Sequence, residues 1–249
     1  MWKIELAGIN KKYVTSTGTL PVLDNISLQV AEQQFVSILG PSGCGKSTIF
    51  NIICGLETAD SGEILFSGAS LTNPSGELSY MPQKDLLLPW RKIIDNVILP
   101  LQIAGVNNKT ARQRAIELLD IFGLKGFEQR YPAELSGGMR QRAALMRTIL
   151  AEKDILLLDE PFGALDAITR FNMQTWLLDV WHRFQRTILF ITHDVEEAIY
   201  LSDKIYVMSQ RPSGIRLAVD VPLARPRQPE IVTSPEFVEI KKAVLKALA

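Results

Sequence analysis

Apolar and polar residues follow two different periods along this chain. Residues 2–9 and 26–39 alternate or run apolar, which predicts strands joined by a turn-rich segment from Thr15 to Pro21. Short apolar stretches at 64–66, 78–83, 187–191 and 204–208 predict further strands. The four consecutive apolar residues at 155–158 are typical of a strand that is buried on both faces of a parallel sheet.

Helical spacing dominates residues 84 to about 151. Apolar residues recur at 115, 118, 119 and 122, after a predicted helix start near Thr110, and again at 139, 143, 146 and 150. This stretch is either a helical insertion between two strands of one sheet or a second layer of the core. Further helices are expected at 167–184, near 195–201, and after Ser234, where Pro235 and Glu236 are start signals. Alternating strands and helices predict an α/β fold with a mostly parallel sheet.

Length and composition favour one domain over residues 1–249, with a helical subdomain at about 84–150 and a C-terminal tail at about 211–249. The 27 basic and 27 acidic residues give zero net charge, so we expect no nucleic-acid partner. Cys44 and Cys54 form no disulfide framework, and we expect both to be reduced. The N-terminus lacks a signal-peptide pattern and no apolar run approaches the length of a membrane span. Work at a membrane would therefore require docking to a protein that spans it.

A phosphate-binding loop is predicted between an apolar strand and a helix. Its residues are Gly40, Pro41, Ser42, Gly43, Cys44, Gly45, Lys46, Ser47 and Thr48. Glycines let backbone N–H groups turn toward phosphate oxygens, and the helix N-terminus adds partial positive charge. Lys46 reaches the β- and γ-phosphates and the Ser47 hydroxyl ligates Mg²⁺. We therefore predict that the chain binds a nucleoside triphosphate.

Two carboxylates end the apolar strand at 155–158. Asp159 suits the acidic partner that positions Mg²⁺ beside such a loop, and Glu160 could polarise an attacking water as general base. The alternative is that the pair merely terminates a strand.

A second anion-binding feature lies at Ser136, Gly137 and Gly138, which open a long helix. One triphosphate cannot easily need two cradles from one chain. Two copies facing each other would use both, each loop capped by its partner's Ser-Gly-Gly helix, in a two-fold arrangement with ATP between them.

The order of these motifs resembles the ATP-binding-cassette (ABC) ATPases over essentially the whole chain. The resemblance rests on Gly40–Thr48, Gln83, Leu135–Met139, Ile155–Glu160, Ala164-Leu165-Asp166 and His193. It implies a P-loop NTPase fold, an ABC-type nucleotide-binding domain with a mostly parallel core sheet, an antiparallel β part and a helical subdomain. It also implies a head-to-tail homodimer that holds two ATP molecules between phosphate loop and signature.

The same resemblance implies roles for four further residues. Tyr13, which by itself suits packing at a sheet edge, matches the aromatic that stacks on adenine. Gln83 matches the residue that senses Mg²⁺ and the water and links the site to a partner subunit. Asp166 matches the loop that crosses the dimer interface, and His193 matches the histidine that senses the γ-phosphate.

Two positions lie apart from this pattern. Met139 departs from the family signature, which usually has glutamine there, and this puts only its side-chain contacts in question. The other histidine, His182, has no match and is expected at the surface.

A narrower resemblance is to the nitrate/sulfonate/taurine group of bacterial importer ATPases, which includes subunits for bicarbonate and for pyrimidine precursors of thiamine. It rests on Pro82–Trp90, on the signature through Arg142, and on Arg225-Pro226-Arg227 with Ser234–Phe237. The resemblance implies a peripheral subunit at the cytoplasmic face of the membrane, paired with a permease and, indirectly, a solute-binding protein. Residues 86–91 would meet the permease; the alternative is that they pack inside the helical part.

Two other classes remain open beside an importer's ATPase. One is a non-transport ABC ATPase in DNA repair or translation; the spacing from Gln83 to Ser136 leaves no room for a long coiled coil, and the chain has one cassette. The other is a scaffold that binds ATP without turnover. The presence of four residues argues against this class: Lys46, Asp159, Glu160 and His193.

Overall fold

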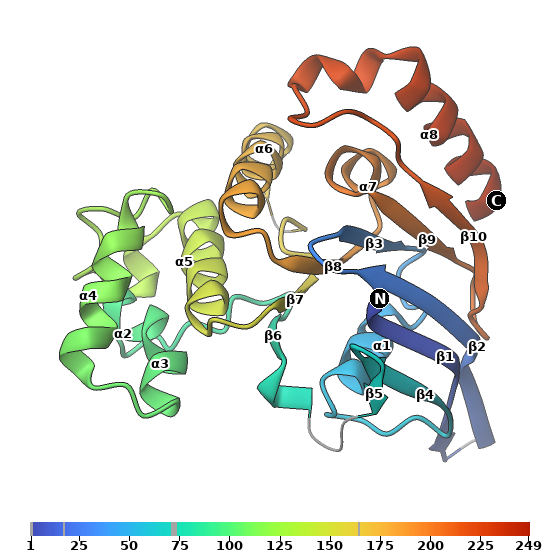
Figure 1. Cartoon of the computed structure of the whole chain (residues 1–249), viewed down its shortest axis with the longest axis horizontal. Helices are drawn as coiled ribbons and strands as arrows, with labels where there is room; N and C mark the ends of the chain where they lie inside the picture. The colour runs from blue at the N-terminus through green and yellow to red at the C-terminus, as the bar shows by residue number, and fades with distance from the viewer. Residues whose placement is uncertain (1, 17, 71–73, 164) are drawn as a thin grey trace. The chain divides into compact units, whose positions relative to one another are not determined.

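The computed structural model describes residues 2–16, 18–70, 74–163 and 165–249 (Figure 1). The chain forms two compact units. The first comprises residues 1–78 and 185–249, and the second comprises residues 79–184. Within the described part of the chain, we find no helix with the length and apolar character needed to cross a membrane.

An antiparallel sheet in the first unit has the strand order β2-β1-β4-β5. Its strands are β1 (Trp2–Thr15), β2 (Gly18–Ala31), β4 (Ser61–Phe66) and β5 (Ala69–Ser70). The strands are joined within the expected segment Thr15–Pro21, but the connection is shorter than predicted: β1 continues to Thr15 and β2 begins at Gly18, so Pro21 lies within β2. Pro21 is tolerated there since β2 is an edge strand, where a missing N–H breaks no ladder.

The core sheet of the first unit contains four strands in the order β10-β9-β3-β8, three of which are parallel. The strands are β3 (Phe35–Leu39), β8 (Thr187–Thr192), β9 (Lys204–Met208) and β10 (Ile215–Asp220). β3 pairs in parallel with β8 and β9, while β10 is antiparallel to β9. Every residue of β3 and β8 is buried, as expected of strands covered on both faces. The carboxyl ends of β8, β3 and β9 therefore lie at one edge of this sheet.

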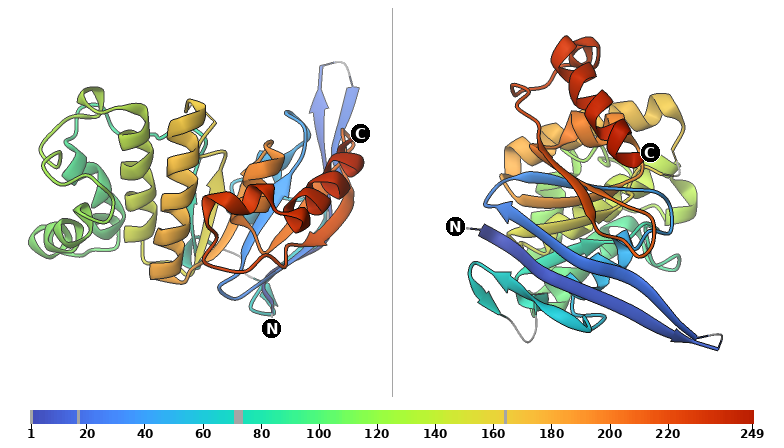
Figure 2. Two further views of the ribbon diagram at one scale, coloured as in Figure 1. Left: turned by 90° about the horizontal axis from the view of Figure 1, so that it is seen from above. Right: turned by 90° about the vertical axis from the view of Figure 1, so that its right-hand side faces the viewer.

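Helices of the first unit follow these strands. They are α1 (Lys46–Ile53), α7 (Val195–Leu201) and α8 (Pro235–Leu248), with short 3₁₀ turns η1 (Pro74–Gly76) and η3 (Pro229–Thr233). Ser234 accepts a hydrogen bond from the N–H of Phe237 at 3.2 Å, which confirms the predicted helix start. Figure 2 shows α8 running along the outside of this unit.

The tail before α8 packs against α7. Arg227 is buried and its guanidinium donates to the carbonyls of Ile199 and Tyr200 at 3.0 and 2.9 Å, at the end of that helix. Burial lowers the pKa of Arg227 to about 10. Phe237 and Val244 of α8 are fully buried. The tail thus contributes to the core of its unit.

The second unit contains two neighbouring strands and most of the helices. β6 (Leu78–Met81) and β7 (Ile155–Asp159) are hydrogen-bonded neighbours. The helices are α2 (Ile93–Val97), α3 (Leu99–Ile103), α4 (Asn108–Leu119), α5 (Gly137–Leu150) and α6 (Ala167–Phe184), with a 3₁₀ turn η2 (Pro132–Glu134). The helical character predicted for 84 to about 151 is confirmed. α4 begins two residues before Thr110, because the Asn107 side chain caps it by accepting from the N–H of Thr110 at 2.9 Å.

Candidate active site

The predicted phosphate-binding loop connects β3 to α1 and takes a conformation that requires glycine. Gly43 and Gly45 have φ angles of 77° and 114°, in the left-handed region. A Cβ atom at Gly45 would lie 2.9 Å from side-chain atoms of both Val22 and Leu23. The turn is therefore pressed against β2 at a point where only glycine fits.

The Lys46 side chain folds back onto the backbone of this loop. Its side chain is only 5% exposed, and its Nζ donates to the carbonyl oxygens of Gly40 and Pro41 at 2.8 and 3.1 Å. The amine thus lies across the mouth of the loop, while the Ser47 side chain is exposed at the first turn of α1. An ammonium group beside free N–H groups at a helix N-terminus forms a site for a phosphate chain.

Tyr13 lies on β1 and is fixed through its hydroxyl. The hydroxyl donates to the carboxylate of Glu57, which also accepts from the Asn51 side chain at 3.2 Å. Burial raises the pKa of the Tyr13 phenol, and the hydrogen-bonded Glu57 carboxylate adds to the rise. Since Asn51 belongs to α1, this network connects the tyrosine to the helix that follows the phosphate loop.

His193 comes directly after β8, where Leu39 at the end of β3 pairs with Thr192. The phosphate loop and His193 therefore leave the same edge of the sheet from adjacent parallel strands. Thr192 donates to the buried carboxylate of Glu197, and the Asp194 carboxylate caps α7 by accepting from the N–H of Glu197 at 3.0 Å. These bonds fix the backbone on both sides of His193 and leave its imidazole exposed.

The second unit holds the predicted acidic residues. Asp159 ends β7, is 4% exposed, and its carboxylate accepts a hydrogen bond from the Tyr80 hydroxyl at 3.3 Å. Glu160 has a φ angle of 42°, which turns the chain away from the strand. The Gln83 amide donates to the Glu160 carboxylate at 3.3 Å. The structure thus brings together two candidate residues that are 77 positions apart in the chain.

Ser136, Gly137 and Gly138 form the N-terminus of α5, as predicted. The Ser136 hydroxyl accepts from the N–H of Met139 at 3.3 Å, so it acts as N-cap. A Cβ atom at Gly138 would lie 3.4 Å from the Thr169 side chain of α6, so this glycine allows close helix packing. The Ser136 side chain is exposed, whereas Gly138 is buried against α6.

Asp166 directly precedes Ala167, the first residue of α6. Its carboxylate accepts from the N–H of Thr169 at 3.0 Å, and hydrogen bonds from Thr169 lower the pKa of Asp166. Ala164, the first residue of the expected interface loop, lies outside the described residues.

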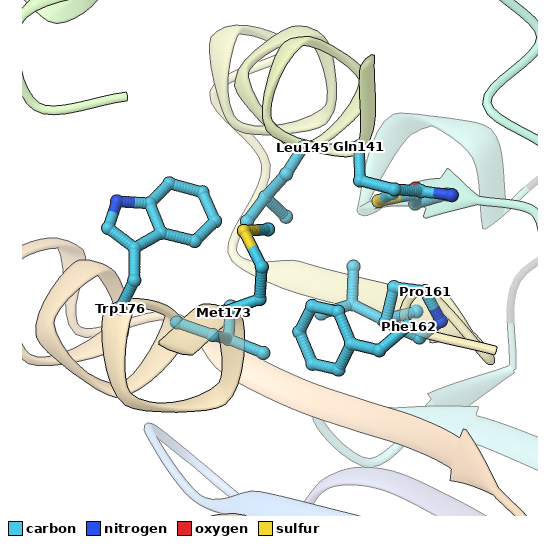
Figure 3. A pocket seen from close by; sticks show the side chains of 9 residues that line it. Gln141, Leu145, Pro161, Phe162, Met173 and Trp176 are labelled. Atoms are coloured by element: carbon cyan, nitrogen blue, oxygen red, sulfur yellow. The ribbon is translucent and has the colours of Figure 1, made fainter. Parts of the chain in front are cut away.

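A small pocket lies between α5, α6 and the segment after β7 (Figure 3). Figure 3 shows Gln141 and Leu145 on α5, and Met173 and Trp176 on α6, around Phe162. Apart from Gln141, every lining residue is apolar. This packing supports the helix that carries Ser136 and the segment that carries Glu160 on a common apolar layer.

Comparison with known proteins decides the family. A family profile described as "ABC transporter" matches residues 23–163, more than half of the chain. The chain belongs to the ABC transporter family. The matched range includes Ser136, Gly137 and Gly138. Hydrolysis of ATP is accordingly the reaction of this ABC protein.

Relatives of this ABC protein match it over nearly its whole length. The aliphatic sulfonates import ATP-binding protein SsuB of Bacillus cereus (strain ATCC 10987 / NRS 248) is 42% identical over 98% of this chain and 94% of its own. A solved dimeric structure of MJ0796, a bacterial ABC transporter cassette, has a TM-score of 0.78 and 29% identity, covering 89% of this chain and all of the other. A post-hydrolysis dimer of MJ0796 bound to ADP and Pi gives a TM-score of 0.77 and 27% identity, with the same coverage.

Two residues of this ABC protein were not singled out by the sequence, and both shape the loop after Gln83. Asn96 is fully buried in α2, and its side chain exchanges hydrogen bonds with the backbone of Leu88 and bonds the carbonyls of Arg91 and Lys92. Arg147 of α5 donates to the loop's backbone carbonyls at Asp85 and Leu86. For Asn96, the available signal was a polar amide that, with Asp95, interrupts the apolar residues of the stretch 93–98.

Residues 86–91 were expected either to lie at a surface that meets a permease or to pack inside the helical part. Some of these side chains are exposed and others are buried. Trp90 is 72% exposed and Leu86 is exposed, whereas Leu87 is buried. Trp90 and Tyr131 line an open pocket of the helical unit together with Arg91, Lys92, Asp95 and Gln102. Pro89 is exposed as well, so the surface and the interior alternatives each hold for part of residues 86–91.

Proposed function

We propose that this protein is the ATP-hydrolysing subunit of a bacterial importer for a small organic or inorganic solute of the nitrate, sulfonate or taurine type. The observation that carries the proposal is the full-length likeness to SsuB, a protein named for aliphatic sulfonate import, in a chain with all its hydrolytic residues. Residues 1–249 would act as one nucleotide-binding domain, with a helical subdomain at about 84–150 and a tail at about 211–249.

ATP binding uses residues from two copies of the chain. Tyr13 stacks on adenine, the loop Gly40–Thr48 surrounds the phosphates, and Lys46 neutralises the β- and γ-phosphates. The signature residues of a second copy, with Ser136 at their start, cap the γ-phosphate from the other side. Asp166 lies at the interface of this two-fold dimer. The exposed N-terminus of α5, with its serine hydroxyl, supports this arrangement.

Hydrolysis requires a base, an orienting group and charge stabilisation. Glu160 takes a proton from the attacking water, whose oxygen bonds to the γ-phosphorus as the bond to the bridging oxygen breaks, leaving ADP and phosphate. Gln83 orients that water, consistent with its hydrogen bond to Glu160. His193 donates a hydrogen bond to the γ-phosphate, and its fixed flanking backbone supports this role.

Mg²⁺ suits the donors that the chain offers. Ser47, Gln83 and Asp159 would hold the ion through a hydroxyl, an amide carbonyl and a carboxylate, which are the oxygen donors that Mg²⁺ prefers. When bound, the ion neutralises charge on the phosphate oxygens.

A permease supplies the membrane-spanning partner, and a solute-binding protein delivers cargo to it. The exposed Trp90 and Tyr131, which line the open pocket of the helical unit, offer apolar side chains for a segment of the permease, and Leu86 of the same loop is exposed as well. This docking would hold the subunit peripherally at the cytoplasmic face of the membrane. ATP-driven closure of the dimer would then move the permease, and hydrolysis would reopen it.

Affinity purification of a tagged Glu160→Gln variant tests the proposal. Loss of the base lowers hydrolysis by about 10²–10⁴-fold, so the ATP-bound assembly accumulates. With ATP present, detergent-solubilised cells should yield a multi-span membrane protein in roughly equal amount, identified by mass spectrometry. Recovery of only soluble proteins, ribosomes or DNA would contradict the importer role.

A further inference from the structure

The segment between β9 and β10, residues 209–214, forms a closed turn beside the phosphate loop. The N–H of Ser209 donates to the Gly214 carbonyl at 3.0 Å, and the N–H of Gly214 donates to the Ser209 hydroxyl at 3.0 Å. Because β9 and β3 are parallel neighbours, with Leu39 paired to Val207, this turn leaves the sheet at the same edge as the phosphate loop. We call residues 209–214 the β9–β10 turn.

Ser213 fastens this turn directly to the phosphate loop. Its side chain is fully buried, and its hydroxyl donates to the carbonyl oxygen of Cys44. Its backbone N–H donates to the Val22 carbonyl at 2.9 Å, and its carbonyl accepts from the N–H of Asp24 at 2.9 Å. The β9–β10 turn is thus held on two sides, by the phosphate loop and by β2.

Arg211 is exposed in this anchored turn, between the exposed Gln210 and Pro212. Its guanidinium lies over the phosphate loop, since a Cβ atom built on Gly43 would be 3.9 Å from an Nη atom. Gln210 and Arg211 line an open pocket with Pro41, Ser42, Gly43 and Cys44. Within the described ranges, no carboxylate forms an ion pair with Arg211.

The positive charge of Arg211 acts on two groups of the expected nucleotide site, Cys44 in the phosphate loop and Tyr13. Burial raises the pKa of the Cys44 thiol, and the Arg211 cation acts in the opposite direction. Burial also raises the pKa of Tyr13, and Arg211 again acts against the rise. The cation therefore lies within electrostatic range of the phosphate loop and of the expected adenine-stacking residue at once.

We propose that Arg211 is a nucleotide-binding residue whose guanidinium bonds the phosphate chain of the ATP held by Gly40–Thr48. This inference rests on the proposed function. Lys46 approaches that chain from the inner side of the loop, where the Gly40 and Pro41 carbonyls hold it. Arg211 approaches from the side of Gly43 as a planar fork that bonds phosphate oxygens in pairs. The anchored turn lowers the ordering cost of this contact, because its backbone is fixed before the ligand arrives.

Nucleotide titration of purified variants tests this role, with the dissociation constants of ATP and ADP measured by calorimetry at low and high salt. Arg211→Met should weaken the binding of both nucleotides by about 10-fold and reduce the salt dependence of binding. Arg211→Lys keeps the charge but loses the fork, so it should recover only part of the affinity. Arg216→Met is the matched control, because Arg216 lies on β10 and donates to the Ala247 carbonyl at 3.3 Å.

Two results would overturn the inference. The first is an Arg211→Met protein that folds normally and binds both nucleotides as the parent does. The second is a loss confined to dimer formation in the Glu160→Gln background, with ADP affinity unchanged, which would assign Arg211 to the partner copy. Lys46→Ala separates this failure from that of the proposed function. If Lys46→Ala loses nucleotide binding while Arg211→Met keeps it, only the role of Arg211 fails; if both keep it, the whole site fails.

Discussion

The Asn96 side chain forms four hydrogen bonds to the backbone of the loop that carries Trp90. Its replacement therefore measures how much these bonds contribute to the free energy of unfolding. The Asn96 Oδ1 accepts from the N–H of Leu88 at 2.7 Å. Its Nδ2 donates to the carbonyls of Leu88, Arg91 and Lys92 at 3.1, 3.0 and 3.2 Å. Asn96→Ala removes all four bonds from a fully buried position.

The expected loss of stability follows from these bonds. Each contributes about 1 kcal/mol net, and part of the exposed backbone regains water, so the variant should lose about 3 kcal/mol. For a chain of this length, about 1 kcal/mol shifts the unfolding midpoint by about 2–4 °C, so we expect a fall of about 6–12 °C. Thermal unfolding followed by circular dichroism measures the midpoint. Asn108→Ala is the control, because exposed Asn108 accepts a single side-chain hydrogen bond, at 3.2 Å from Gln102.

The aspartate variant gives the same test a pH dependence. Asn96→Asp retains one accepting oxygen but places the second against three carbonyls, which raises the carboxyl pKa in the folded protein. When a carboxyl has a higher pKa in the folded than in the unfolded protein, the free energy of unfolding decreases as the pH rises from the unfolded pKa to the folded pKa. Asn96→Asp should therefore be closer to the parent at about pH 5 than at about pH 8. An unchanged midpoint for Asn96→Ala, or a pH trend of the opposite sign for Asn96→Asp, would refute the reasoning.

Three further predictions follow from other parts of the molecule. Gly45→Ala should abolish nucleotide binding in filter assays, because the φ angle of 114° and the 2.9 Å approach to side chains of β2 exclude a methyl group; retained affinity would contradict this. Trp90→Ala should leave the unfolding midpoint unchanged, since the side chain is 72% exposed, yet reduce ATPase activity in the permease complex, whereas equal activity would remove Trp90 from the interface. Burial raises the pKa of Cys54 to about 12, so its alkylation by iodoacetamide should be slow at neutral pH and accelerate up to that value, and rapid labelling at neutral pH would disprove the burial.

The phosphate loop shows what local sequence determines. Its glycines, Lys46 and Ser47 are adjacent in the chain, and their chemistry depends on backbone geometry that a nine-residue stretch largely sets for itself. The buried apolar runs of β7 and β8 likewise predict where these strands end. They therefore also place Asp159 at the end of β7 and His193 directly after β8. The N-cap at Ser136 and the start of α8 are equally local. Where one segment carries its own signal, the sequence was sufficient.

Contacts between distant segments were decided by tertiary structure alone. The Gln83–Glu160 hydrogen bond and the Ser213–Cys44 hydrogen bond each join residues that no local pattern pairs. The connection between β1 and β2 is shorter than the predicted segment Thr15–Pro21 for the same reason, because pairing with β1 extends the ladder to Gly18, beyond what local propensity indicates. Arg211 is the clearest case. Nothing in its local sequence indicates a contact with the phosphate loop, and the two lie together only because β3 and β9 are parallel neighbours that end at the same edge of the sheet.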